Sequence, residues 1–155
     1  MPKVDVTFRE AKKEDLPVLV SMLADDPLGT TREEVASPLH ADYLAAFEAI
    51  RGSEHHHLMV VEQVHHGIVG MLQLSLLPNL SHKGAWRCLI EGVRIHRNYR
   101  GKGLGQQMFQ WAIDFARSKG CRMVQLTTDK KRPDALSFYE RLGFEATHIG
   151  LKMKL

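Results

Sequence analysis

Three glycines at every second position could bring the main chain close to a phosphate group. Gly101, Gly103 and Gly105 lie in the stretch RNYRGKGLGQQMFQW, just before the apolar stripe of a long helix. The unpaired N–H groups at a helix N-terminus, together with about half a positive charge from the helix dipole, attract anions. Glycine allows a close approach to such an anion. The pattern indicates a phosphorylated cofactor, although a flexible turn before a helix would use the same residues.

Positive side chains surround these glycines and suit a pyrophosphate or a ribose phosphate. They are Arg97, Arg100 and Lys102. Two other phosphate-binding loops fit poorly. No GxxxxGK followed by Ser or Thr occurs in the chain. The dinucleotide pattern would need a glycine at Gln106 and normally follows the first strand of its domain.

The histidines and cysteines do not form a metal-binding pattern. His55–His57 are consecutive, so in a strand they point to alternating faces and cannot easily converge on one ion. His65 and His66 are expected in a turn. Cys88 and Cys121 have no CxxC partner, which favours reduced thiols in the core. We therefore expect no metal site.

The apolar spacing predicts alternating strands and helices that would position the glycine loop. The expected order is a strand over 4–9, helices over 15–25 and 43–52, a hairpin of 58–64 and 68–77, a strand over 88–96, a helix over 103–119, a strand over 123–128, a helix over 133–142 and a last strand over 148–154. This order predicts an α/β fold, with a mixed sheet that has helices on both faces.

Length and composition agree with one compact domain covering residues 1–155. Hydrophobic residues make up 44% of the chain and charged residues 25%, as in ordinary globular proteins. No apolar run approaches the roughly 20 residues that a membrane span needs. The first ten residues lack a secretory signal, so a cytoplasmic protein is expected. Lys and Arg are scattered, which argues against a nucleic-acid surface.

Two further motifs accompany the glycine loop, because RGKGLG follows IEGVRI at 90–95 and is followed by ALSFYERLGF at 135–144. In these motifs and their order the sequence resembles the GNAT superfamily of N-acyltransferases. The resemblance implies a mostly antiparallel sheet and acetyl-CoA as co-substrate. Arg100, Gly103 and Gly105 match the pyrophosphate loop of the family. Main-chain amides of the same loop would help to bind the pyrophosphate, and main-chain groups of the preceding strand would bind the pantetheine arm: Gly101, Lys102, Leu104 and Gln106 in the loop, and Val93, Arg94 and Ile95 in the strand.

The resemblance also implies that a primary amine attacks the thioester directly, through a tetrahedral intermediate. An amine with a pKa of ~10.4 is mostly protonated at neutral pH, so a base must accept a proton. Glu91 is the first candidate, because strand alternation would place it on the face of Val93 and Ile95. Alternatively, Glu91 pairs with Arg94 or Arg122.

A tyrosine is the candidate acid for the departing thiolate. Tyr139 occupies the tyrosine of the family's FYxxxGF motif, which relatives use as a general acid. The alternative is an aromatic anchor that packs against Ala135 and Leu142. For the base, His96 is the second candidate after Glu91.

One position departs from the family pattern. Relatives commonly place an asparagine three residues before the alanine of the second motif, where it contacts pantetheine, and Arg132 stands there before Ala135. With Lys130 and Lys131, Arg132 could contact cofactor phosphates or a substrate carboxylate, or belong to a solvated loop.

These features predict an N-acetyltransferase that acts on a primary amine of a small molecule or a protein. The alternative is a noncatalytic, CoA-binding regulatory domain. The acidic stretch of Asp25, Asp26, Glu33 and Glu34 would favour a cationic amine. Dimers are frequent among relatives, which leaves a homodimer open, but no patch in this sequence establishes one; nucleic-acid and membrane partners are not expected.

Overall fold

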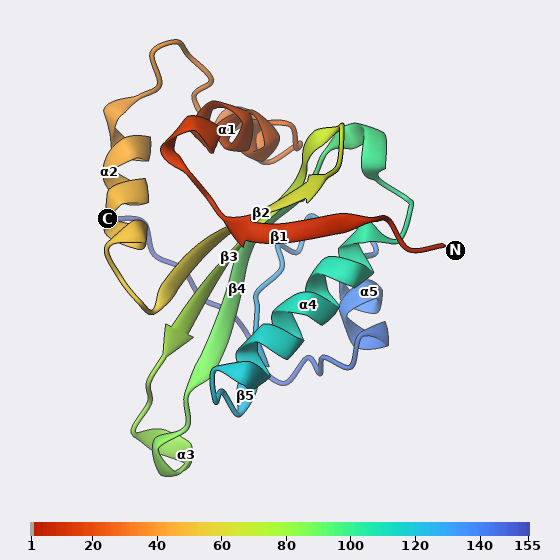
Figure 1. Cartoon of the computed structure of the whole chain (residues 1–155). Coiled ribbons are helices and arrows are strands. Elements are labelled where there is room, and N and C mark those ends of the chain that lie inside the picture. Colours follow the sequence, from red (N-terminus) through yellow and green to blue (C-terminus); the bar gives the residue numbers. More distant parts are fainter. Residues whose placement is uncertain (1) are drawn as a thin grey trace.

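A five-stranded sheet forms the centre of the computed structural model, which describes residues 2–155 (Figure 1). The strands lie side by side in sequence order. The first four are antiparallel and the last is parallel to its neighbour. They are β1 (Val6–Glu10), β2 (His56–Gln63), β3 (Gly67–Leu77), β4 (Arg87–Ile95) and β5 (Met123–Gln125). The expected mixed, mostly antiparallel sheet is therefore confirmed.

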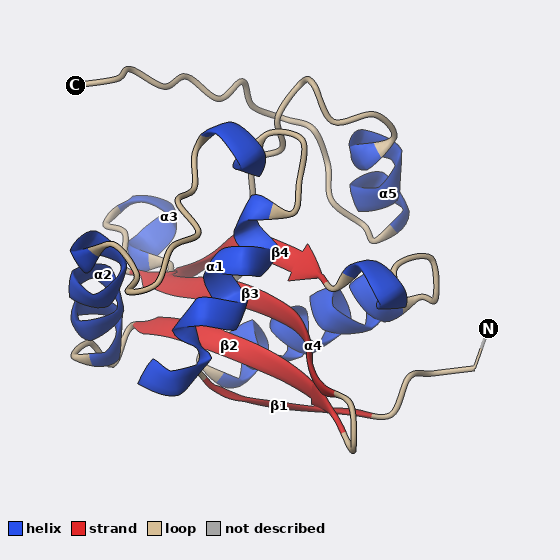
Figure 2. Cartoon of the chain, turned by 90° about the horizontal axis from the view of Figure 1, so that it is seen from above, coloured by secondary structure: helices blue, strands red, loops and turns tan. Residues whose placement is uncertain are grey.

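Helices cover both faces of this sheet (Figure 2). Helices α1 (Leu16–Ala24) and α2 (Ala41–Arg51) pack on one face, and α4 (Leu104–Ser118) packs on the other. A short helix, α3 (Ser81–Gly84), lies in the connection between β3 and β4, and α5 (Ala135–Arg141) follows β5. Of the helices described over 2–155, none is long and apolar enough to cross a membrane.

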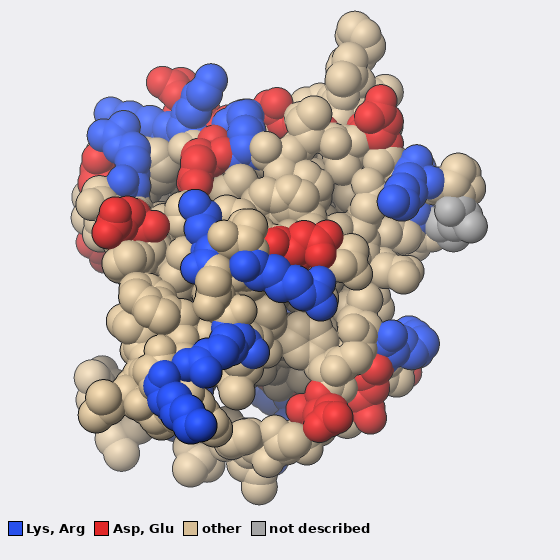
Figure 3. All heavy atoms as spheres, turned by 60° about the horizontal axis from the view of Figure 1, so that its bottom comes forward, with Lys and Arg blue, Asp and Glu red and all other residues tan. Residues whose placement is uncertain are grey.

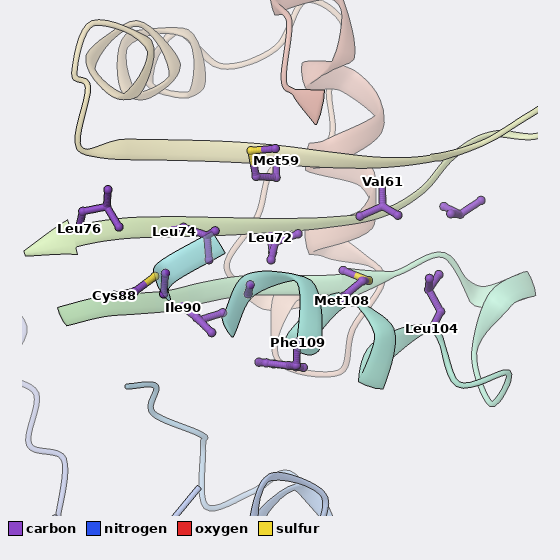
Figure 4. Packing of buried hydrophobic residues seen from close by; sticks show 13 residues of the cluster. Met59, Val61, Leu72, Leu74, Leu76, Cys88, Ile90, Leu104, Met108 and Phe109 are labelled. Carbon is purple, nitrogen blue, oxygen red and sulfur yellow. The ribbon is translucent and has the colours of Figure 1, made fainter. Parts of the chain in front are cut away.

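Helix α4 is held to the sheet by an apolar stripe with helical spacing (Figure 4). Leu104, Met108, Ala112 and Ala116 are buried against residues of β2, β3 and β4. A Cβ added to Gly70 of β3 would lie 2.9 Å from Met108 Sδ. The absence of a side chain at Gly70 therefore lets α4 pack close to the sheet and fixes the position of its N-terminus.

The opposite face has a second, smaller core. Leu19 and Met22 of α1 and Phe47 of α2 are buried against Val60 of β2 and Met71 of β3. Strand β2 is buried on both faces, because Met59 and Val61 belong to the core under α4. The end of α1 is thereby fixed above β4, where the candidate site lies.

The last predicted strand is wrong. Over the described residues, 148–154 form no strand, and the apolar side chains of this segment are largely exposed to solvent. Strand β5 is also shorter than the predicted 123–128. A strand needs a pairing partner as well as an alternating pattern, and the pattern alone does not supply one. The other predicted strands and helices are confirmed within a few residues at their ends. That residues 1–155 form one domain stays a prediction.

A β-bulge interrupts β4 at Gly92. Gly92 has a φ of 59°, and the pairing with β3 shifts at this point. Glu91 lies opposite Gln73, whereas Arg94 lies opposite Met71. Two residues of β4 lie between Glu91 and Arg94, whereas only one residue of β3 lies between their partners. The side chains of Glu91 and Arg94 therefore point to the same face of the sheet, which is the face covered by α1.

The bulge overturns one expectation about the faces of β4. Val93 and Ile95 pack against the core under α4, which is the opposite side of the sheet from Glu91. The prediction that Glu91 shares a face with Val93 and Ile95 is therefore wrong, because strict alternation does not hold across a bulge.

Candidate active site

The second half of β4 has an open edge. Strand β4 pairs with β5 only from Arg87 to Leu89, and the two strands are not paired beyond that point. His96 N donates to Val69 O across 2.8 Å, so alternate residues of β4 direct their main-chain groups toward β3. The main-chain groups of Val93 and Ile95 consequently point away from β3, toward the open edge of β4. This placement fits the expectation that they bind an extended ligand.

A cavity of about 900 Å³ lies beside this edge, a size typical of small-molecule sites. Residues from the end of α1, from β4, from the start of α4 and from α5 line it. They are Asp25, Asp26, Pro27, Val93, Arg94, Ile95, Arg100, Gly101, Gly103, Leu104, Gly105, Gln106, Phe109, Arg132, Phe138, Tyr139, Arg141 and Leu142. The cavity thus brings together Tyr139 and all the predicted cofactor-binding residues except Lys102, whereas the candidate bases Glu91 and His96 do not line it.

The N-terminus of α4 presents free amides at this cavity. Gly103 adopts a φ of 79° before the helix, and Gln107 N donates to Gly103 O across 3.2 Å as the first helical bond. The amides of Leu104, Gly105 and Gln106 precede that bond and have no partner within the helix. A Cβ on Gly105 would lie 3.3 Å from Ile95 Cδ1, so the helix begins in close contact with β4. This arrangement can bind an anion.

Asp26 joins two arginines at the wall of the cavity. Arg132 donates two hydrogen bonds to its carboxylate, at 2.6 and 3.0 Å, and an Arg94 nitrogen lies 3.8 Å away. The Gly29 N–H also donates to this carboxylate, across 3.0 Å. The hydrogen bonds from Arg132 are the main reason that the pKa of Asp26 falls to about 2. Asp26 is therefore ionised and holds Arg132 against the end of α1.

Asp25 makes a second connection between the end of α1 and the glycine loop. Its carboxylate accepts hydrogen bonds from Arg97 at 2.8 and 3.1 Å. Arg100 donates to Asp25 O across 3.0 Å and to Ile95 O across 3.1 Å. Asp25 and Asp26 are thus both paired with arginines. Of the four residues of the acidic stretch, only Glu33 and Glu34 take no part in these pairs.

Arg94 is a largely buried cation at the same wall. Its side chain is 14% exposed, and Nη1 donates to Val93 O across 2.9 Å. The buried Nε has no partner among the described residues. Burial lowers the pKa of Arg94, which nevertheless remains a cation at neutral pH. An anionic ligand group in the cavity would complete its hydrogen bonding.

Tyr139 lines the cavity from α5. Its ring packs edge-on against Phe109 and Phe138, both with centroids 5.3 Å away, and against Phe144. Burial raises the pKa of the Tyr139 hydroxyl, whereas the nearby Arg132 and Arg94 lower it to a lesser degree. The ring is therefore packed as an aromatic anchor, and it also belongs to the lining of the cavity.

Three candidates lie outside the cavity lining. Glu91 is exposed and forms no ion pair with Arg94 or Arg122 among the described residues, so the pairing alternative is wrong. Lys102 Nζ lies 5.4 Å from the ring centre of Tyr99. The His96 ring accepts a hydrogen bond from Asn98 N, across 3.2 Å.

His56 and His57 direct their side chains to different partners on opposite faces of β2, as strand alternation predicts. His57 Nδ1 lies 2.6 Å from Glu10 Oε1, and His56 Nδ1 lies 3.0 Å from Ser75 Oγ. Within residues 2–155, no cluster of three or more histidine, cysteine or acidic side chains could hold a metal ion.

Several lining residues were not predicted as catalytic or cofactor-binding residues. They are Asp25, Asp26, Pro27, Phe109, Phe138, Arg141 and Leu142. Phe138 and Leu142 could be predicted from the sequence, because both lie in the stretch ALSFYERLGF that also contains Tyr139. The contact between Asp26 and Arg132 joins residues far apart in sequence, and no local pattern predicts it.

Comparisons with known proteins identify the family of the chain. Residues 20–144 match the Acetyltransferase (GNAT) family. A crystal structure of a transcriptional regulator from Bacillus halodurans C-125 is 50% identical, with a TM-score of 0.93, and the match covers 97% of this chain and 100% of that one. A Trypanosoma brucei acetyltransferase structure is 30% identical, with a TM-score of 0.77 and the same coverage.

Two curated relatives carry substrate names. Glucosamine 6-phosphate N-acetyltransferase of Trypanosoma brucei brucei is 36% identical over 57% of this chain. Aminoalkylphosphonate N-acetyltransferase of Salmonella typhimurium is 35% identical over 53% of this chain. The matches span 58% and 53% of these relatives' own lengths. Since the family match extends over most of the sequence, the chain belongs to the Acetyltransferase (GNAT) family.

Proposed function

We propose that the chain transfers an acetyl group from acetyl-CoA to a primary amine. The observation that carries this proposal is a single cavity in which free amides at the start of α4 and the half-buried Tyr139 lie together. Family membership supports acetyl-CoA as the donor. The amides of Leu104, Gly105 and Gln106 would bind the pyrophosphate, with Gly101 and Gly103 leaving room for it.

Charged and main-chain groups would complete the cofactor site. The main-chain groups of Val93 and Ile95 on the open side, whose carbonyls accept hydrogen bonds from Arg94 and Arg100 in the structure, would bind the pantetheine arm as a strand binds its neighbour. Arg100 would turn from Asp25 toward the phosphates, and Lys102 lies next to it in the loop. In this proposal the same cavity neutralises the charge of the cofactor phosphates and aligns the thioester.

Proton transfer would use two residues. The attacking nitrogen forms the new C–N bond, the C–S bond breaks, and the Tyr139 hydroxyl donates a proton to the sulfur. The raised pKa of Tyr139 keeps this proton in place at neutral pH. Because Glu91 is exposed and lies outside the lining, it would accept the amine proton through water.

The acceptor amine would carry an anionic group. Arg94 and Arg132 lie near Tyr139 and influence its pKa, and Arg94 Nε lacks a partner among the described residues. A phosphate or phosphonate would suit two neighbouring guanidinium groups. The substrates named for the two curated relatives, a sugar phosphate and aminoalkylphosphonates, support this class.

Turnover with a panel of amines tests the proposal. The protein is incubated with acetyl-CoA and with amines that do or do not carry a phosphate, and released thiol is measured. We expect turnover, and a higher kcat/KM for the phosphorylated amines. Equal kcat/KM values for both groups would contradict the acceptor class but not the acetyl transfer.

A conservative variant tests the role of Tyr139. Tyr139→Phe should lower kcat by roughly 10²- to 10⁴-fold, the range for loss of general acid catalysis. Its affinity for CoA, measured by calorimetry, should change little, because the ring still packs against Phe109. Tyr99→Phe is the matched control, since Tyr99 does not line the cavity. Unchanged kcat in Tyr139→Phe would remove Tyr139 from the acid role.

A noncatalytic, CoA-binding regulatory domain is the second candidate. The 50% identical Bacillus halodurans protein, named as a transcriptional regulator, favours it. Binding of CoA without thiol release on any amine would support this candidate over the enzyme. On the face in Figure 3, basic and acidic side chains are interspersed, which does not suit a nucleic-acid surface.

A further inference from the structure

Three arginines from separate segments of the chain converge on one oxygen of Asp26. This Oδ2 atom lies 3.0 Å from Arg132 Nη2, 3.8 Å from Arg94 Nη2 and 3.9 Å from Arg32 Nη2. The Gly29 N–H donates to the same oxygen across 3.0 Å. Arg32 lies in the connection between α1 and α2, Arg94 in β4 and Arg132 after β5. The tertiary fold therefore gathers three cations around a single carboxylate.

These three cations contact only one negative charge. Among residues 2–155, Asp26 is the only carboxylate within ion-pair distance of the three guanidinium groups. Glu33 and Asp129 act on the cluster from farther away. Their side chains already accept hydrogen bonds, from the Tyr43 hydroxyl and from the Lys131 amide. The cluster therefore lacks negative charge at contact distance.

Much of the hydrogen-bonding capacity of these arginines is also unused. The contacts of Arg32 and Arg94 with Asp26 exceed hydrogen-bond distance, so they neutralise charge without using N–H donors. Arg94 Nη1 donates to Val93 O, but its buried Nε has no partner among the described residues. Within residues 2–155 the Arg32 side chain makes an ion pair but no hydrogen bond. Phosphate and phosphonate oxygens are the acceptors that such donors prefer.

We propose that Arg32 joins Arg94 and Arg132 in binding a doubly charged phosphate or phosphonate of the acceptor amine, with Asp26 holding the three side chains in place. This inference rests on the proposed function, to which it adds Arg32 and a preference for two negative charges. A dianion together with Asp26 balances three guanidinium groups, whereas a carboxylate leaves one positive charge unbalanced. We call Arg32, Arg94 and Arg132 the arginine subsite.

The position of the arginine subsite favours the acceptor over the cofactor as the source of this dianion. Arg94 points to the α1 face of β4, whereas α4, with its free amides, packs on the opposite face of the sheet. Arg32 is 52% exposed and does not line the cavity, so it would reach the ligand from the solvent side. A phosphate bound there would leave the α4 amides free for CoA.

Calorimetry with inorganic phosphate on the full chain tests the arginine subsite. At about pH 8 phosphate is mostly a dianion. With CoA present at saturation, we expect phosphate to bind roughly tenfold more tightly than acetate. Arg32→Gln should weaken phosphate binding by roughly tenfold, the effect of losing a charge-assisted contact, and should leave the affinity for CoA unchanged. Arg51→Gln is the matched control, because Arg51 is an exposed arginine of α2 that pairs with Glu48.

Steady-state kinetics with a phosphorylated amine gives a second readout. Arg32→Gln should raise KM by roughly tenfold and leave kcat nearly unchanged, because Arg32 would bind the substrate and the transition state alike. Arg51→Gln should match the wild type in both values. An unchanged KM in Arg32→Gln would contradict a role of Arg32 in binding the acceptor.

Three binding results would overturn the inference. They are phosphate that binds no more tightly than acetate, phosphate affinity that is unchanged in Arg32→Gln, and displacement of phosphate by CoA, which would assign the arginine subsite to the cofactor. Failure of the proposed function gives a different result. Phosphate binding that depends on Arg32, without thiol release on any amine, would contradict acetyl transfer and leave the arginine subsite in place as an anion site. Thiol release with phosphate binding that does not depend on Arg32 would contradict only the inference.

Discussion

At the scale of single residues, the candidate site is organised by aspartates that pair with arginines. Asp26 is 10% exposed and holds Arg132 with two hydrogen bonds, while Arg94 lies nearby. Removing the charge of Asp26 would leave two neighbouring cations without their counter-ion in a poorly solvated place. Stability should therefore depend on Asp26 more than on exposed acidic residues.

Asp26→Asn should lower the free energy of unfolding by about 1 to 3 kcal/mol, the cost of leaving buried charged groups without a partner. Urea unfolding near neutral pH measures this change. Asp25→Asn is the matched control, because Asp25 is more exposed, and it should cost less. A smaller loss for Asp26→Asn than for Asp25→Asn would show that the Asp26 pair does not stabilise the fold.

The pH dependence of this effect has a defined direction. The pKa of Asp26 falls from 3.8 to about 2 on folding, so its carboxylate stabilises the native state. That stabilisation is fully present above pH 3.8 and is lost as the pH falls toward 2. The difference in unfolding free energy between wild type and Asp26→Asn should shrink over this interval. A difference that stays constant would contradict the pairing.

At the scale of secondary-structure elements, the contact between α4 and β4 decides where the free amides lie. Gly105 faces Ile95 across a gap that leaves no room for a methyl group without movement, since the added Cβ would lie 3.3 Å from Ile95 Cδ1. Phe138 Cζ would lie 3.6 Å from the same Cβ. A methyl group at this position would require Ile95 Cδ1 or the first turn of α4 to move by a few tenths of an ångström, next to the amides that face the cavity.

Gly105→Ala should therefore weaken CoA binding by roughly tenfold, or about 1.4 kcal/mol. Calorimetry with CoA measures the affinity. Gln110→Ala provides the control, because Gln110 lies on the exposed side of the same helix. Equal affinities for the two variants would contradict a role of this close contact in cofactor binding.

The elements also show which features a sequence can predict. The hairpin of β2 and β3 and the helix α4 depend on local alternation, a turn and an apolar stripe, and all of these are visible in the sequence. The bulge at Gly92 depends on pairing with β3, and the pairing of Asp26 with Arg132 depends on the tertiary fold. These long-range features have no local signal. The glycine loop and Tyr139 were found through motifs, whereas the face of Glu91 was misplaced by strict alternation.

At the scale of the whole molecule, the cavity joins segments that are distant in the chain. The end of α1, the second half of β4, the start of α4 and helix α5 each contribute lining residues. Asp25 and Asp26 connect the first of these segments to the others through arginines. A ligand that contacts all four segments would stabilise the complete fold rather than one part of it.

CoA should therefore raise the melting temperature of the whole chain in a single transition. At a free concentration of about 100 times Kd, binding to the native state adds about 2.7 kcal/mol. For a chain of this length, each kcal/mol shifts the melting temperature by about 2 to 4 °C, which gives a rise of roughly 5 to 10 °C. Pantetheine at the same concentration is the control, because it lacks the pyrophosphate that the α4 amides would bind. Its rise should be much smaller, and equal rises for the two ligands would contradict binding of the pyrophosphate at the glycine loop.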